Sequence, residues 1–217
     1  MVSDQRIRVI VIDHHRMFTE TLATFLSQHE DIVVEGVADL ADRGVALAES
    51  LRPDVAVVDY RLPDEDGAAV TRRIQAVSPG TKVLVIAGYA DKHILTSAVK
   101  AGCSGFVTKD KAARELVVAI RGAHYGGVYL PPRALDGLAG GGPVPAGRVG
   151  ANLTRRELGV LQLLADGYSN QSIASELTLS LHTVRNHVQR ILGKLGAHSK
   201  LEAVSIAYHE DLVRSPE

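Results

Sequence analysis

Apolar residues in the first half of the chain occur as short continuous runs that alternate with longer stretches of helical periodicity. The runs IRVIVI, DIVVEGVA, DVAVVDY, KVLVIAGY and GFVTK mostly lack polar alternation, so we expect strands covered on both faces. Amphipathic stretches predict helices over about 17–28, up to about Leu51, after Gly67, through Ala101 and over about 111–124. Strand-helix units with short right-handed connections predict an α/β fold with a doubly wound, five-stranded parallel sheet.

Polar chemistry follows the predicted strands where their carboxyl ends meet. In an open parallel sheet, ligands bind outside those ends, and Asp13, Asp59, Ala87 and Lys109 all stand there. A carboxylate that accepts a phosphoryl group needs Mg²⁺, which prefers oxygen ligands, and a nearby ammonium stabilises the phosphate dianion. Asp13, Asp59 and Lys109 supply parts of such a site, although Asp59 alone would more simply be an acid at a strand end.

The second half of the chain changes character. From Pro131 the segment PPRALDGLAGGGPVPAGRVGA is dense in glycine, proline and alanine, which is typical of a linker, and helical periodicity follows it. Four short helices are expected there, with N-caps at Thr154, Ser169, Ser180 and Ser199. We therefore predict an α/β domain over 6–125, a linker over 126–151 and an all-α four-helix domain over 152–214.

The third predicted helix of the second domain has the pattern of a DNA-reading helix. Only LTLS separates it from the second helix, and no acid occurs from Ser180 to Leu201. Val184, Val188, Ile191 and Leu195 follow core spacing, which leaves Thr183, Arg185, Asn186, Gln189 and Arg190 largely outward. Arginine, asparagine and glutamine read base edges, whereas Thr183 and Lys194 suit phosphates. The alternative interpretation is that this charged face of the helix only contacts solvent, but its spacing and charge favour DNA binding.

This domain resembles the LuxR-type helix-turn-helix, through LTRRE, GYSNQSIA and SLHTVRNHV. The resemblance implies that the third helix enters the major groove, with Arg185, Asn186 and Gln189 nearest the bases and His187 near the backbone. His182 stands where the family often has lysine, which weakens one phosphate contact. By the same analogy the fourth helix, 199–209, pairs two copies on promoter DNA as a homodimer.

The first domain resembles the receiver of two-component response regulators, so the whole chain is similar to a NarL/FixJ-type response regulator. In VAVVDYRLPDEDG, Asp59 matches the phosphoacceptor, Lys109 matches the lysine that pairs with the phosphoryl group, and Asp13 matches one acid of the Mg²⁺ pair. The resemblance also implies a histidine kinase as a partner. No enzyme activity is expected, because Arg61 stands where a phosphatase with an Asp-x-Asp nucleophile has its general acid.

Three residues of the predicted pocket depart from the receiver pattern. His14 replaces the second acid, Ala87 replaces a serine or threonine that bonds the phosphoryl group, and Phe106 replaces a tyrosine. A Mg²⁺ ion held by Asp13 and Asp59 would be weakened by His14, and no other cofactor is indicated. We therefore predict a DNA-binding regulator with an atypical receiver, controlled by constitutive dimerisation, a small ligand or a partner protein. The alternatives are a conventional phosphorylation-activated regulator and an interaction adaptor that binds no DNA.

The adjacent histidines leave two further hypotheses open. With Asp13 and Asp59, His14 and His15 offer the imidazole and carboxylate donors that suit zinc. Adjacent residues rarely point into one site, however, so the sequence favours His15 as the start of the following helix. Alternatively, a protonated His14 replaces Mg²⁺ as the counter-charge, which would make DNA affinity depend on pH.

Composition adds limits rather than a function. The 217 residues carry a formal net charge of −1, so a nucleic-acid partner must be met by a local basic patch. One cysteine, Cys103, excludes an intramolecular disulfide and is expected to be a packing residue. The sequence has neither a signal-peptide pattern nor about 18 continuous apolar residues, so we expect a cytoplasmic protein without membrane contact.

Overall fold

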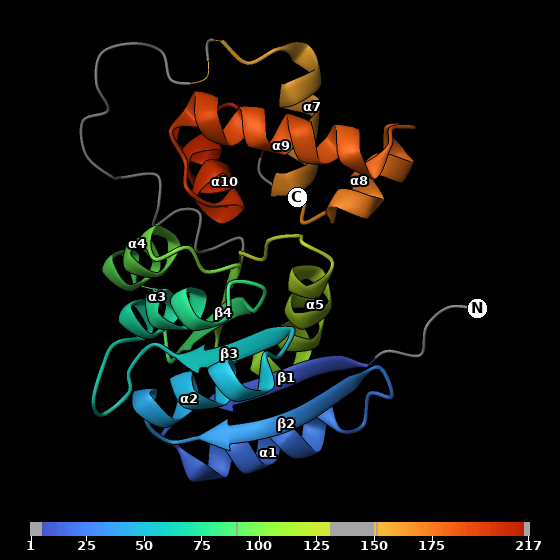
Figure 1. Cartoon of the computed structure of the whole chain (residues 1–217). Helices are drawn as coiled ribbons and strands as arrows, with labels where there is room; N and C mark the ends of the chain where they lie inside the picture. Colours follow the sequence, from blue (N-terminus) through green and yellow to red (C-terminus); the bar gives the residue numbers. More distant parts are fainter. Residues whose placement is uncertain (1–5, 90, 131–149, 151, 215–217) are drawn as a thin grey trace.

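The computed structural model describes residues 6–89, 91–130, 150 and 152–214, so most of the predicted linker lies outside the described residues (Figure 1). An α/β domain comes first and a helical domain follows it. The elements of the first domain are β1 (Ile7–Ile12), α1 (Arg16–Leu26), β2 (Ile32–Ala38), α2 (Ala41–Leu51), β3 (Val55–Asp59), α3 (Gly67–Val77), β4 (Lys82–Ala87), α4 (Lys92–Lys100), β5 (Gly105–Thr108) and α5 (Ala112–His124).

The five strands form one parallel sheet in the order β2-β1-β3-β4-β5, which confirms the predicted doubly wound topology. Successive residues of a strand serve opposite faces: Val9 and Val11 pack with Leu22 of α1, whereas Ile10 and Ile12 belong to the core under α2, α3 and α4. Helices therefore shield both faces of the sheet from solvent, which explains the continuous apolar runs in the sequence.

The helical domain consists of α7 (Arg155–Ala165), α8 (Asn170–Glu176), α9 (Leu181–Leu195) and α10 (Lys200–His209). Each begins at the predicted cap, and the side chains of Thr154, Ser169, Ser180 and Ser199 all accept a backbone N–H of their own helix. The four apolar positions predicted for the third helix are all buried in α9. Sequence spacing thus located this helix-turn-helix correctly.

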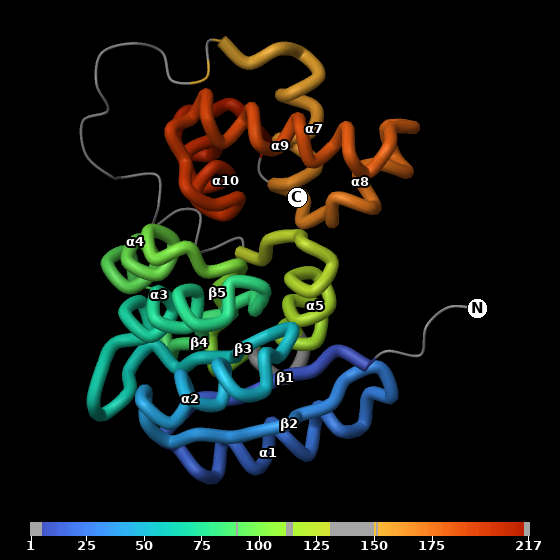
Figure 2. Tube along the Cα trace, in the orientation of Figure 1, coloured from blue at the N-terminus to red at the C-terminus, as the bar shows by residue number. Residues whose placement is uncertain are grey.

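The two domains meet where α10 contacts α4, above the end of the sheet formed by β4 and β5 (Figure 2). The Lys200 ammonium, at the start of α10, donates to the carbonyl of Gly126, just after α5, and to Asn170 Oδ1 at 2.8 Å.

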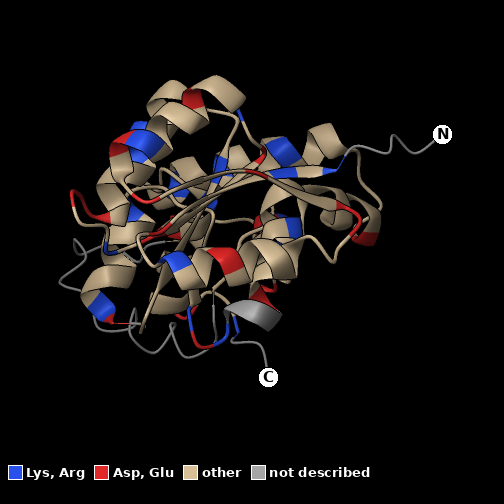
Figure 3. Cartoon of the chain, turned by 90° about the horizontal axis from the view of Figure 1, so that it is seen from below, with Lys and Arg blue, Asp and Glu red and all other residues tan. Residues whose placement is uncertain are grey.

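Lysine, arginine and acidic residues are interspersed over the chain, in keeping with its near-zero net charge (Figure 3). Within the described ranges, no helix is long and apolar enough to cross a membrane.

Candidate functional site

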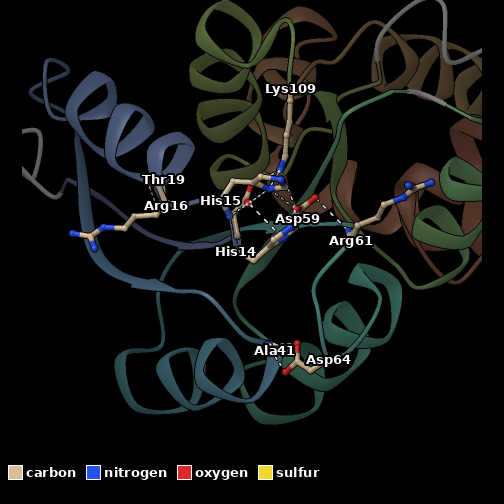
Figure 4. Close-up of polar contacts among 10 residues, drawn as sticks. His14, His15, Arg16, Thr19, Ala41, Asp59, Arg61, Asp64 and Lys109 are labelled. Atoms are coloured by element: carbon tan, nitrogen blue, oxygen red, sulfur yellow. Dashed lines mark hydrogen bonds and ion pairs between the residues drawn. The ribbon is translucent and has the colours of Figure 1, made fainter.

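The carboxyl edge of the sheet gathers the polar residues predicted to lie there. Asp13 follows β1, Asp59 ends β3, and both are only 2% exposed. The Lys109 ammonium, reaching in after β5, lies 2.6 Å from Asp13 Oδ2 and 2.9 Å from Asp59 Oδ2. Figure 4 shows Lys109 and the two histidines converging on Asp59. Three chain segments far apart in sequence therefore form one ionic cluster.

A tight turn holds the end of β3 in place. Within LPDEDG the N–H of Gly67 donates to the carbonyl of Tyr60 at 2.7 Å, and the Asp66 carboxylate caps α3. A Cβ on Gly67 would lie 2.7 Å from the Tyr60 Cα and 2.9 Å from the Asp59 carbonyl oxygen. This close approach requires glycine, because neither contact atom is a side-chain atom that could move aside. The Asp64 carboxylate caps α2 through the N–H of Ala41 at 2.9 Å.

A second candidate site lies on α9. Arg185, Asn186, Gln189 and Arg190 are exposed there, one helical turn apart in two pairs, and Val188 between them is buried. This arrangement presents two guanidinium and two amide groups on the side of α9 away from its core, as predicted. His187 is half-buried, with its Nδ1 buried and without a hydrogen-bond partner among the described residues.

The two residues expected to reach phosphates are engaged within the domain. The Lys194 ammonium donates to Glu157 Oε2 at 2.7 Å and to the Asn152 carbonyl at 2.9 Å. The Thr183 hydroxyl lies 2.8 Å from that of Ser180 at the start of α9. Lys194 therefore differs from the expectation, because its partner Glu157 lies on α7 and helical spacing within α9 could not reveal it.

Comparison with known proteins gives both domains a family. Residues 9–121 match the response regulator receiver domain, and residues 151–207 match the bacterial regulatory proteins of the luxR family. The chain is 35% identical to the "probable transcriptional regulatory protein NarL" of Mycobacterium tuberculosis over 209 residues, covering 96% of this chain and 97% of that protein. The chain is a NarL/LuxR-type response regulator. It belongs to a family of transcription regulators rather than of enzymes.

Further relatives match this chain over nearly its full length. The regulator is 31% identical to the transcriptional regulatory protein DegU of Brevibacillus brevis over 220 residues, covering 94% of this chain and 93% of DegU. The response regulator ChrA has a solved structure at 30% identity, a TM-score of 0.52 and coverage of 95% of this chain and 98% of ChrA. RcsB of Salmonella typhimurium, at 22% identity and a TM-score of 0.57 over 92% of this chain and 97% of RcsB, shares the fold.

Both histidines of the response regulator face the ionic cluster, where the sequence argument expected only His14. His14 Nδ1 lies 3.4 Å from Asp59 Oδ2, and His15 Nδ1 lies 3.0 Å from Asp13 Oδ1 and 3.8 Å from Asp59 Oδ2. His15 does begin α1, as its N-cap, but its extended backbone also turns the ring towards the cluster. The expectation that adjacent side chains would diverge was therefore wrong here.

The residues at this edge fit Mg²⁺ poorly. Asp13, His14, His15 and Asp59 each place one donor atom within 4.8 Å of all the others. Two of these four donors are imidazole nitrogens, whereas Mg²⁺ prefers an octahedron of hard oxygens. The Lys109 ammonium contacts both carboxylates but brings only one positive charge to two negative ones, so the donor set rather than the charge disfavours Mg²⁺.

The two other departures from the receiver pattern lie on the neighbouring strands β4 and β5. Ala87 ends β4, is buried, and offers a methyl group where a hydroxyl would bond a phosphoryl group. Phe106 in β5 is fully buried among apolar side chains. Burial raises the pKa of Asp59; the Lys109 ammonium opposes this rise and the Asp13 carboxylate adds to it.

One contact near the site was not predicted from the sequence. The Arg61 guanidinium donates to the hydroxyl of Tyr89, which follows β4 and is half exposed. Both residues follow strand ends, which is the signal that could have identified them. Cys103, by contrast, is the expected packing residue, since it is buried in the apolar core, and this burial raises the pKa of its thiol to about 12.

Proposed function

We propose that this response regulator binds promoter DNA as a homodimer through α9, and that its receiver is controlled without conventional phosphorylation of Asp59. The observation that carries the second part is the cluster at the strand ends. Asp59 is already bonded to Lys109, His14 occupies the position of a metal-binding acid, and no hydroxyl is available at Ala87. Capture of Mg²⁺ and the response to a phosphoryl group are thus both impaired.

DNA binding is supported by the exposed side chains of α9 and by a neighbour of the same fold. Arg185 and Asn186 lie beyond the first turn of α9, where a helix docked by its N-terminal half places base-reading groups. A solved structure of an RcsB–DNA complex has a TM-score of 0.57 to this chain and covers 94% of it. At 21% identity that likeness is one of fold, so the assignment rests on α9 itself.

Promoter binding is tested by fluorescence anisotropy with DNA fragments selected from a random pool. Wild-type protein is expected to bind the selected fragments with an affinity that falls steeply as salt increases, because phosphate contacts release counterions. Enrichment of an inverted repeat would support the homodimer. Association that is absent or insensitive to salt would contradict the proposal and favour an interaction adaptor.

Control of the receiver is tested by intact mass after incubation with a small phosphodonor and Mg²⁺. Wild type and Asp59→Asn are expected to remain unmodified, while His14→Asp, which restores the acid pair, is expected to gain one phosphoryl group. A gain in wild type alone, absent from Asp59→Asn, would overturn the proposal. In that case a histidine kinase becomes the expected partner, rather than a small ligand or a partner protein.

A further inference from the structure

We propose that His14, His15, Asp13 and Asp59 form a binding site for a divalent transition-metal ion of the zinc type. This inference deepens the proposed function, on which its regulatory meaning rests, because it names the chemical class of the ligand. The ion would bind at the edge of the receiver where Asp59 stands. It differs from the Mg²⁺ site implied by the resemblance in its donors, and therefore in the metals that it selects.

Distances between the donor atoms fit a small tetrahedral ion. Zinc binds nitrogen and oxygen ligands at about 2.0–2.2 Å, which places neighbouring tetrahedral ligands about 3.3–3.6 Å apart. His14 Nδ1 lies 3.4 Å from Asp59 Oδ2 and 4.0 Å from Asp13 Oδ1. The corresponding distances for His15 Nδ1 are 3.8 and 3.0 Å. These four distances lie within about half an ångström of the tetrahedral range, and all four donor atoms lie within 4.8 Å of one another, so a rearrangement of side chains alone would bring them around one ion.

The chemistry of the donors selects against Mg²⁺. Two imidazoles and two carboxylates form a mixed nitrogen and oxygen set, which suits zinc and its neighbours in the first transition row. The rings of His14 and His15 lie with their centroids 3.8 Å apart, and the Nδ1 atoms of both lie within 4 Å of Asp59 Oδ2. A single histidine beside an acid would not distinguish a metal site from an ordinary ion pair, but two converging on two buried acids do.

The surroundings hold the donors in place. Asp13 Oδ1 accepts the backbone N–H of His15 at 2.9 Å, and the Asp13 N–H donates to the Ala38 carbonyl at 2.9 Å. Asp59 Oδ1 accepts the N–H of Arg61 at 3.3 Å. Such outer contacts orient metal ligands, since they fix which carboxylate oxygen faces the ion.

Charge in the cluster also favours a cation. Among the described residues, Lys109 is the one lysine or arginine within ion-pair distance of Asp13 or Asp59. Its single charge faces two buried carboxylates, so one negative charge remains when both histidines are neutral. Neutral imidazole is the form that binds metal, and a divalent ion would supply the missing positive charge. Lys109 can keep its ion pair with Asp13 Oδ2 while Asp13 Oδ1 faces the ion. Its contacts with Asp59 Oδ2 at 2.9 Å and His15 Nδ1 at 3.3 Å would give way to the metal.

The test is metal titration of the full chain after removal of bound metal with a chelator. Calorimetry with Zn²⁺ is expected to give one ion per chain, and Co²⁺ is expected to develop the visible absorption of a tetrahedral nitrogen and oxygen site. Mg²⁺ should produce neither result. Loss of either ring, in His14→Ala or His15→Ala, should weaken Zn²⁺ binding by more than the about 10–100-fold that a supporting partner contributes.

Two further variants keep the result interpretable. His93→Ala removes an exposed histidine at the start of α4 and should leave the titration unchanged. His14→Asp replaces one imidazole with a third carboxylate and should exchange the Zn²⁺ preference for a Mg²⁺ preference. Equal Zn²⁺ affinity in wild type and in the double variant lacking both rings would overturn the inference, as would an octahedral Co²⁺ spectrum. Circular dichroism establishes that each variant is folded.

Failure of this inference is distinguishable from failure of the proposed function. The titration contains no phosphodonor, and the phosphorylation experiment contains Mg²⁺ and no transition metal. If wild-type protein accepts a phosphoryl group and also binds Zn²⁺, only the proposed control without phosphorylation is overturned. If it neither accepts a phosphoryl group nor binds Zn²⁺, only the proposed metal site is overturned.

Discussion

Arg185 stands on α9 with its side chain exposed, directly after the buried Val184. Its guanidinium has no ion-pair partner among the described residues, so it is available to a base edge or a phosphate. We expect Arg185→Ala to weaken binding to selected promoter DNA by about 1–3 kcal/mol, because a bidentate contact is lost. Anisotropy titrations at several salt concentrations measure this loss.

The matched control for that prediction is Arg43→Ala. Arg43 is an exposed arginine on α2 of the receiver, paired with Asp39 at 2.9 Å, and it lies outside the helical domain. Its loss changes the net charge equally and should leave DNA affinity nearly unaltered. Equal effects of the two substitutions would mean that only the overall charge of the chain matters.

Individual residues of the candidate site were predictable to different degrees. Asp13, Asp59 and Lys109 could be placed together from sequence because parallel strands bring their carboxyl ends to one edge. The convergence of His14 and His15 could not be, since it depends on the backbone angles at the N-cap of α1. The same limit applies to Lys194, whose partner Glu157 is 37 residues away. Strand patterns fix which residues share an edge, but not where their side chains turn.

The turn between β3 and α3 depends on one glycine. Gly67→Ala would place a methyl group against the backbone of Tyr60 and Asp59. We expect a loss of about 1–3 kcal/mol in the free energy of unfolding, because fixed backbone must shift. Gly122→Ala, in α5, meets no atom within 4 Å and should leave stability equal or raise it by up to about 1 kcal/mol. Scanning calorimetry of the full chain compares the two, and similar melting temperatures would contradict this account of the turn.

A buried ion pair joins α7 to α9. Glu157 completes the capping box with Thr154 and accepts from Lys194, and these contacts, led by that from Lys194, lower the pKa of Glu157 to about 2. Glu157→Gln should cost about 1–3 kcal/mol, because Lys194 is left half-buried without its counter-charge. Thermal unfolding measures this loss of stability. The control is Glu176→Gln, because Glu176 is an exposed glutamate on α8.

The same pair predicts a pH dependence of the helical domain. Since the pKa of Glu157 is lower in the folded state than its ordinary 4.5, the pair stabilises the domain fully above about pH 4.5. That stability is lost as the pH falls from about 4.5 towards 2, where Glu157 becomes protonated. Glu157→Gln should show a smaller loss over this interval, and equal losses in the two proteins would remove Glu157 as the cause.

Element boundaries were predicted well because caps and periodicity are local signals, whereas the contact between the domains is not. Every residue of α10 is buried or half-buried, since the helix contacts α7 and α9 within its own domain and α4 of the receiver. An amphipathic helix has one polar side that faces solvent, whereas α10 has no exposed side. In this arrangement the helix expected to pair two DNA-binding domains is covered by the receiver, so homodimerisation through α10 would require the domains to separate.

Lys200 places a titratable group at this contact. Burial lowers its pKa to about 8, with Lys82 and Arg185 adding to the effect. Lys82, Lys100 and Arg72 of the receiver and His198 ahead of α10 line a cavity of about 560 Å³ with it, and no acid is among the lining residues. Closing the domains therefore brings like charges together.

The population of closed chains should consequently depend on pH. In a separated chain Lys200 would lose the burial and the Lys82 charge that the receiver contributes, whereas Arg185 of its own domain would stay near it. Its pKa would therefore rise from about 8 towards its ordinary 10.5, and the open form binds more protons within the interval from about pH 8 to 10.5. Closure should then become more favourable as the pH rises through that interval, and small-angle scattering should record a falling radius of gyration. Lys200→Met, which cannot titrate, should flatten this dependence. Identical profiles for the two proteins would show that Lys200 does not control the contact, and a rising radius would contradict the sign of the effect.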